Sequence, residues 1–186
     1  MIGCSSSRIP TGNFLSDSII IYDKVRLGYD DSNSKIVLRG KVSIVTDSVI
    51  NFTFFGPLGV EIISGKIGSS LDLKSQFADS LTTQVNMKIF DTFGLELNRK
   101  MVENLLLFNS VKLYKQLLNS CPQNVTVGLL AKNVNIDVIT LIDNNHKSTS
   151  RITFIKKERF PLEIFIEYIR RDYFLKVRLD VLSVRK

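Results

Sequence analysis

The sequence predicts a mostly β protein with a helical insert (α+β), built as a strongly curved antiparallel sheet that forms an unclosed β-barrel. Alternating apolar and polar residues recur in short runs at both ends of the chain, which indicates half-buried strands. Between them lies a stretch with apolar residues at helical spacing. The 186 residues, 44% hydrophobic and 23% charged, suit one folded domain. We assign it to residues 19–186, after a leader rich in small polar residues, 1–18, that reads as a flexible tether.

The first half is predicted to be a meander of four strands. The clearest strand covers residues 35–45, whose apolar residues fall on one face and whose basic residues fall on the other. A polar turn over residues 30–34 joins it to a strand over 19–29, so the two form a hairpin. The next two strands are expected over residues 49–55 and 60–66.

The central stretch predicts helices. Apolar residues recur at helical spacing over residues 83–93, and Gly94 follows as a C-cap. Asn98 can cap a second helix that runs to about Phe108, and residues 111–118 can add a third. These helices are more apolar than a solvent-facing helix needs, so we expect them to pack into the concavity of the sheet as a lid or plug. The enclosed face would then be an apolar cavity of the kind that binds lipids.

The last third returns to the β pattern from residue 124 onward. A hairpin is expected from residues 135–142 and 149–156, joined by a polar turn. Two more alternating strands follow over residues 162–169 and 173–181.

One loop stands out, Gly56-Pro57-Leu58-Gly59, between two predicted strands. Two glycines relax the backbone and Pro57 fixes its own φ, so the loop can hold its one large side chain outward. Leu58 either folds back onto the hairpin or protrudes. A protruding apolar tip has no stabilising role, so it would indicate contact with a membrane or a partner.

The N-terminus offers a second motif. Cys4 follows Met1-Ile2-Gly3 and precedes three serines, which is similar to the end of a bacterial lipoprotein signal, where the cysteine is lipidated. A signal peptide also needs a basic region and an apolar region of about 7–15 residues. Either the sequence as given omits that segment, or Cys4 is an ordinary exposed thiol.

Together these features resemble the LolB family, outer-membrane lipoproteins that receive lipoproteins from the periplasmic carrier LolA and insert them into the membrane. The similarity covers residues 19–186 and is tightest at Pro57-Leu58-Gly59; the following Val60-Glu61-Ile62 and the closing strands from Phe160-Pro161-Leu162 also match. The family fold is an unclosed β-barrel with a helical lid. This chain lacks tryptophan, which is common in the family, and its helical insert is longer.

The resemblance implies roles for particular residues. Leu58 would push the incoming lipoprotein into the membrane, Gly56, Pro57 and Gly59 would shape its loop, and Cys4 would carry the lipid anchor. The protein would face the periplasm from the outer membrane, with a LolA-like carrier, client lipoproteins and the inner leaflet as partners. The residues that would line or cover the acyl-chain cavity, or else form the core, are Phe52, Phe54, Phe90, Phe93, Met101, Leu105 and Phe108.

No enzyme is expected. The sequence lacks the common nucleotide, hydrolase and zinc motifs, and we expect no cofactor and no metal. His146 lies in a polar turn and is expected to be exposed. Cys121 has no nearby histidine to activate it. Glu163 and Glu167 would stand about 13 Å apart along one strand, too far for a paired-carboxylate site.

Three functions remain open. The first is an insertase, and the alternative is a lipid or lipoprotein carrier that does not deliver. The formal charge of +7 suits an acidic carrier or anionic head groups. It also allows a nucleic-acid-binding barrel, which would need aromatics interleaved with cations. Lys35, Arg39 and Lys41 have none between them, although Phe174 near Arg171, Lys176 and Arg178 is a partial match. Of the three, we favour lipid binding over nucleic-acid binding, and we expect a monomer.

Overall fold

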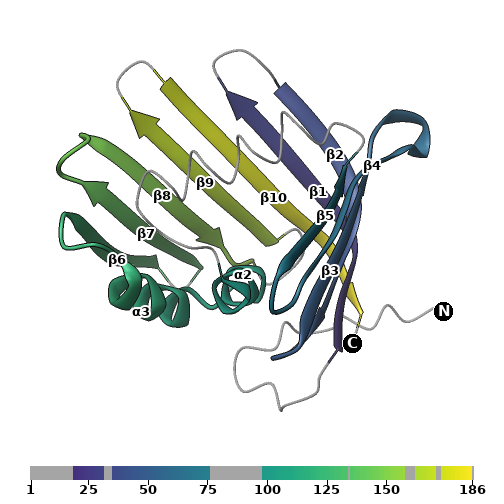
Figure 1. Ribbon diagram of the computed structural model, residues 1–186, viewed down its shortest axis with the longest axis horizontal. Helices are drawn as coiled ribbons and strands as arrows, with labels where there is room; N and C mark the ends of the chain where they lie inside the picture. Colours follow the sequence, from purple (N-terminus) through teal and green to yellow (C-terminus); the bar gives the residue numbers. More distant parts are fainter. Residues whose placement is uncertain are drawn as a thin grey trace.

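Ten antiparallel strands form one sheet in the computed structural model, which describes residues 19–31, 35–75, 98–133, 135–157, 162–170 and 173–185. Two helices lie on one side of the sheet (Figure 1). The strands are β1 (Ile19–Asp31), β2 (Lys35–Val45), β3 (Val49–Phe55), β4 (Glu61–Ile67), β5 (Leu71–Ser75), β6 (Val125–Asn133), β7 (Ile136–Asp143), β8 (Ser148–Ile155), β9 (Leu162–Arg170) and β10 (Tyr173–Arg185). The helices are α2 (Arg99–Leu106) and α3 (Ser110–Ser120), and a short 3₁₀ turn, η1 (Pro57–Gly59), lies between β3 and β4.

The sheet consists of two meanders joined through the first and last strands. Its order is β5-β4-β3-β2-β1-β10-β9-β8-β7-β6, so β1 to β5 form one wing and β6 to β10 form the other. β1 and β10, both 13 residues long, pair antiparallel at the junction. In the described strands β5 and β6 are the two edges, so the sheet is unclosed, as the sequence predicts.

The predicted strands are present in the structure, but two details of the prediction are wrong. The first meander has five strands and not four, because Leu71–Ser75 pairs with β4. The last strand continues to Arg185, where its final residues pair with the start of β1. The predicted helices beginning after Asn98 and near residue 111 are present as α2 and α3, whereas the expected helix over residues 83–93 and its cap Gly94 lie outside the described residues.

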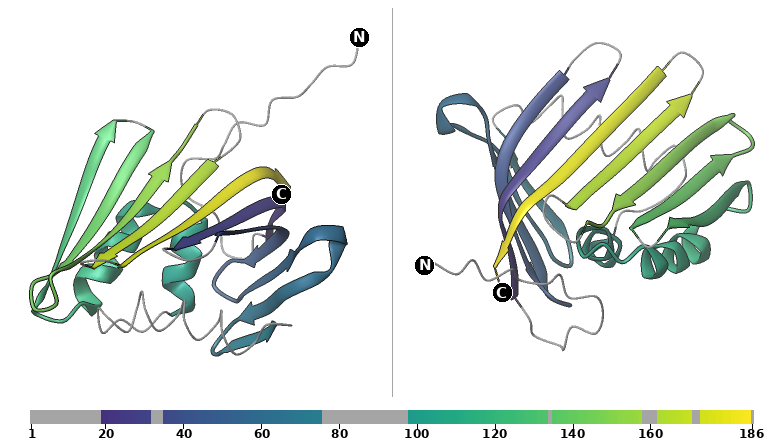
Figure 2. Two further views of the ribbon diagram at one scale, coloured as in Figure 1. Left: turned by 90° about the horizontal axis from the view of Figure 1, so that it is seen from above. Right: turned by 180° about the vertical axis from the view of Figure 1, so that it is seen from behind.

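The sheet is bent so that its two wings face the same side (Figure 2). α2 and α3 lie on this concave side. The convex side carries the polar halves of the strands, as in β2, where buried Leu38 and Val42 alternate with exposed Arg39 and Lys41. The alternation therefore sorts the sheet into an apolar inner face and a more polar outer face, which is basic at β2.

Polar contacts fix both helices to the sheet. The side chain of Asn98 accepts a hydrogen bond from the Met101 amide and caps α2. Tyr22 on β1 donates from its hydroxyl to the Leu106 carbonyl at the end of the same helix, 2.7 Å away, and burial raises the pKa of Tyr22. Ser110 at the start of α3 donates to Asp137 on β7. The helices are thus tied to both wings.

Candidate functional site

The first part of the candidate site is a continuous apolar area on the concave face, which we call the concave patch. Its six side chains lie on four neighbouring strands, β9, β10, β1 and β2. They meet through two cross-strand rows, one from Ile166 through Val177 and Tyr29 to Ile36, the other pairing Leu179 with Leu27. All six are partly exposed although they contact the buried core. An apolar area of this kind can contact an apolar ligand. The sequence predicts the strands that carry these six residues, but not that the six come together.

The residues predicted to line or cover a cavity are mostly part of the core. Phe54, Met101 and Phe108 are each buried, and Phe108 packs edge-on against Phe154 with ring centroids 6.3 Å apart. Phe52 and Leu105 are partly buried against the same core. Phe90 and Phe93 lie outside the described residues. Large aromatic and aliphatic side chains at helical or alternating spacing look alike in sequence whether they line a cavity or fill a core, so sequence alone does not separate the two.

The second part of the candidate site is the loop between β3 and β4. Gly56 donates to the Val60 carbonyl at 2.9 Å, which closes the loop, and Pro57, Leu58 and Gly59 form the turn η1. A Cβ atom on Gly56 would come within 2.9 Å of the Ile62 side chain, so glycine is needed for the close approach of the two strands. Leu58 is fully exposed, at 101% of its reference area. The first alternative for this residue, folding back onto the hairpin, is wrong.

Leu58 also has an unusual backbone. Its φ is +63° and its ψ is +13°, the left-handed region that is costly for a residue with a branched side chain. The next residue, Gly59, has φ +75° without that cost. A fully exposed leucine in a strained conformation gains nothing from packing, and such outliers concentrate at functional positions.

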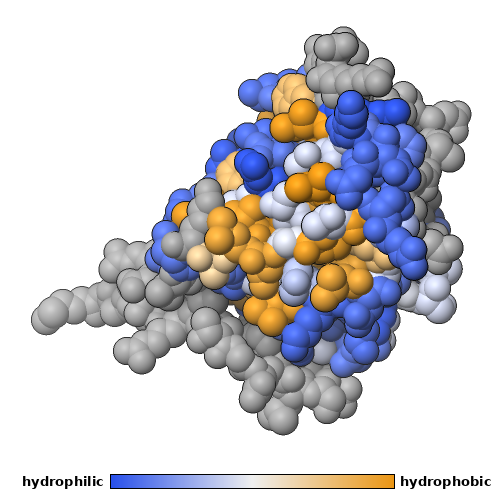
Figure 3. All heavy atoms as spheres, turned by 90° about the vertical axis from the view of Figure 1, so that its left-hand side faces the viewer, coloured by the Kyte–Doolittle hydropathy of each residue, from blue (hydrophilic) through white to orange (hydrophobic). Residues whose placement is uncertain are grey.

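Exposed apolar side chains also occur elsewhere. The side of the molecule at the left of Figure 1 has apolar residues gathered in its middle with polar residues around them (Figure 3). On β6, β7 and α3, which form this side, the exposed large apolar residues are Leu130, Ile142, Val111 and Leu118. Any test of Leu58 therefore needs a control at one of these positions.

Titratable side chains form structural pairs. His146, 53% exposed, is bonded through Nδ1 to an oxygen of the buried Asp143 at 2.5 Å. Burial alone would raise the pKa of Asp143, but hydrogen bonds from His146, Asn124 and the Asn145 amide outweigh it and lower the pKa to about 2. This pair closes the β7–β8 turn. Burial raises the pKa of the Cys121 thiol, which disfavours a nucleophilic thiolate.

Glu163 lies beside a second carboxylate, which is on the neighbouring strand and not on β9. Asp180 on β10 is its cross-strand partner, and both are buried. Arg178 bridges them, at 2.6 Å to Asp180 and 3.2 Å to Glu163, and Lys157 adds a bond to Glu163. The two carboxylates are thus neutralised by cations, which is the arrangement of a structural ion network.

The cations next to Phe174, which partly match a nucleic-acid-binding pattern, form ion pairs in this same region. Lys176 bonds Glu167 at 3.2 Å, and Lys176 and Arg178 both stand over the ring of Phe165. These cations already have protein partners, and Arg171 lies outside the described residues. Phe174 is 40% exposed, so the pattern consists of one exposed aromatic ring beside cations that are paired within the protein.

Comparison of the chain with protein-family models and with curated proteins finds no match in either set. None of the described helices has the length and apolar character required to cross a bilayer. In the described part of the chain, no three His, Cys, Asp or Glu residues are grouped so as to hold a metal ion. The class that the fold defines is a mostly β protein with an unclosed antiparallel sheet and two helices on its concave side.

Proposed function

We propose that this protein is a lipoprotein acceptor and insertase of the LolB type, a protein that is not an enzyme. The single observation that carries the proposal is Leu58, fully exposed and held at φ +63° by its loop. The left-handed backbone sets Leu58 apart from the other exposed apolar residues, and an apolar side chain held outward in this way gains free energy when a membrane interface removes it from water.

In this proposal, the concave patch binds the acyl chains of the client. Six partly exposed apolar side chains on adjacent strands offer a surface for the acyl chains of a client lipoprotein. Each methylene group kept out of water is worth about 0.8 kcal/mol, so the acyl chains are expected to pass from one apolar site to the next. In this proposal the helices α2 and α3 act as the lid, a LolA-like carrier delivers the client, and Leu58 leads the acyl chains into the outer membrane. Cys4, outside the described residues, would carry the anchor.

The decisive experiment measures transfer of a labelled lipoprotein from a purified carrier, through this protein, to phospholipid vesicles. We expect Leu58→Glu to accept the client normally and to lose most transfer to vesicles, because a carboxylate does not enter the apolar layer. Leu130→Glu on β6 is the matched control: the same substitution at a leucine that is 57% exposed and lies outside the lid helices, with transfer expected to remain normal. Unchanged transfer by Leu58→Glu would contradict the insertase role and would favour the alternative, a carrier that does not deliver.

Acceptance is tested separately at the concave patch. Leu179→Gln keeps the size of the side chain and adds an amide, so we expect binding of a fluorescent fatty acid to weaken several-fold. Leu130→Gln makes the same change at a residue 57% exposed on β6 and should bind the probe as the wild type does. Equal binding by both variants would place the acyl chains elsewhere and reject this part of the proposal.

A further inference from the structure

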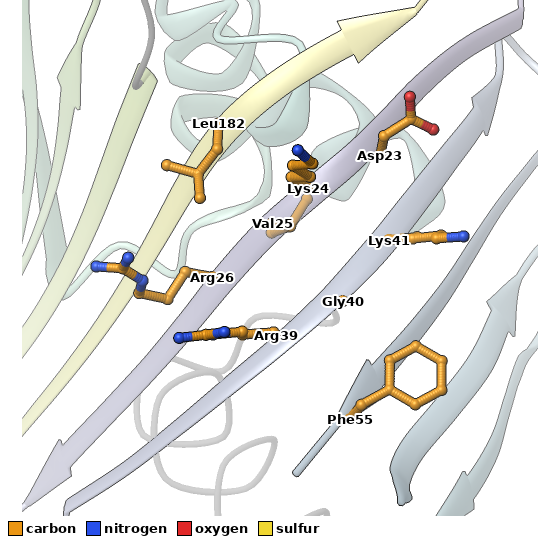
Figure 4. Close-up of a pocket in the computed structure, with 9 residues that line it drawn as sticks. All are labelled: Asp23, Lys24, Val25, Arg26, Arg39, Gly40, Lys41, Phe55 and Leu182. Atoms are coloured by element: carbon orange, nitrogen blue, oxygen red, sulfur yellow. The ribbon is translucent and has the colours of Figure 1, made fainter. Parts of the chain in front are cut away.

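The convex face contains a pocket that the proposed function does not use. It has a volume of about 430 Å³ and lies across β10, β1, β2 and β3. Four of its nine lining residues are basic, namely Lys24, Arg26, Arg39 and Lys41, and Asp23 is the one acidic residue among them. In Figure 4 the side chains of Arg26 and Arg39 extend in the same direction from neighbouring strands.

The shape of the pocket comes from an irregularity in β1. The register of β1 shifts between Tyr22 and Val25 against β2, and near the same residues against β10. A bulge of this kind redirects side chains that would otherwise alternate regularly. Here it places Lys24 beside the outward-facing row formed by the cross-strand partners Arg26, Arg39 and Phe55.

Most of the positive charge in the pocket is not neutralised. Asp23 is bonded to Arg185, and Arg26 lies 3.9 Å from Asp180. For Lys24, Arg39 and Lys41, the described part of the chain provides no carboxylate within salt-bridge distance. Three cations gathered without a counter-ion favour an anionic ligand, and a guanidinium group is well matched to phosphate oxygens.

The pocket also has apolar walls at two sides. Leu182 on β10 and Phe55 on β3 flank the cations from opposite directions (Figure 4). Phe55 is only three residues before Leu58, at most about 11 Å along the chain. A leucine inserted into a membrane would therefore bring the pocket close to the phosphate layer.

We propose that this pocket binds the phosphate of an anionic phospholipid head group and so orients the protein on the membrane. This inference rests on the proposed function, because it assumes that Leu58 enters the bilayer to whose surface the pocket binds. It assigns them different tasks: Leu58 contacts the apolar layer of any bilayer, whereas the pocket responds to the charge of the lipid.

The test is binding to vesicles of pure phosphatidylcholine and to vesicles that also contain phosphatidylglycerol. The double variant Arg39→Gln/Lys41→Gln should bind the anionic vesicles at least about tenfold more weakly and should bind neutral vesicles as the wild type does. Lys112→Gln/Lys115→Gln on the exposed side of α3 removes the same charge away from the pocket, and binding should change less than about twofold. Thermal melts verify that both variants are folded.

Three outcomes would overturn the proposal. Unchanged binding of anionic vesicles by the pocket variant would show that the pocket is not a head-group site. An equal loss in both double variants would show that binding depends on the net charge of the protein and not on the pocket. Tight binding of soluble glycerol phosphate or of a single-stranded oligonucleotide, lost in the pocket variant, would assign the pocket to another anion. Failure of the insertase role is distinct, because it would leave transfer by Leu58→Glu intact on both kinds of vesicle.

Discussion

The concave face has two regions that are built from the same kinds of residue and differ in how they are covered. In the covered region, Phe154 of β8 is fully buried and packs against Phe108, between α2 and α3. In the concave patch, Leu179 and Leu27 belong to the same sheet but remain partly exposed. The difference shows that alternation in a strand determines which face is apolar, but not how far each part of that face is buried.

Polar contacts help to hold the helices in place, in addition to their buried apolar residues. Glu103 of α2, itself buried, accepts from Arg99 at 2.7 Å and from the Asp47 amide in the β2–β3 turn. Asp137 of β7 accepts from Ser110 of α3 and from Lys156, 2.9 Å away. These bonds give the covered region a fixed geometry, and the concave patch lies beyond their reach.

The largest expected effect is a difference in stability between the two regions. Phe154→Ala should lower the free energy of unfolding by about 3–5 kcal/mol, because it leaves a cavity among packed side chains. Leu179→Ala should lower it by only about 1 kcal/mol, since the side chain is already partly in water. Urea denaturation of both variants measures the comparison. Equal losses would mean that the concave patch is ordinary core and that acyl chains bind elsewhere.

A smaller effect concerns the attachment of α3. Burial raises the pKa of Asp137, but bonds from Ser110 and Lys156 outweigh it, so the folded-state pKa is below its ordinary value. A lowered carboxyl pKa stabilises the fold above the unfolded-state value near 4, and this stabilisation is lost as the pH falls through the folded-state value. Asp137→Asn should cost about 1–2 kcal/mol at pH 7.

The pH dependence separates this attachment from general acid effects. Between pH 7 and about pH 3, Asp137→Asn should lose less stability than the wild type, because the variant has no carboxyl group left to protonate at this site. Denaturant midpoints at several pH values test this. Parallel curves for the two proteins would show that the bonds to Asp137 do not hold α3 in place.

Much of the fold could be predicted from the sequence, because strand alternation and helix caps are local signals. The strand over residues 35–45 and the cap at Asn98 are examples, and the structure has both. Less of the candidate site could be predicted from the sequence. Leu58 was recognisable because a turn has no need for leucine, but the concave patch depends on cross-strand partners far apart in sequence, such as Leu27 and Leu179. The convex pocket depends on a bulge in β1, for which the sequence carries no clear signal.

The smallest expected effect on stability is at Leu58, and its sign is opposite to the others. Asparagine tolerates positive φ better than leucine, and Leu58 makes no buried contact to lose. Leu58→Asn should therefore leave the free energy of unfolding unchanged or raise it by up to about 1 kcal/mol. Denaturation measures the gain, and vesicle transfer by the same variant should fall. A residue that costs stability and is needed for transfer is kept for its function, whereas a destabilised variant would mean that Leu58 supports the fold.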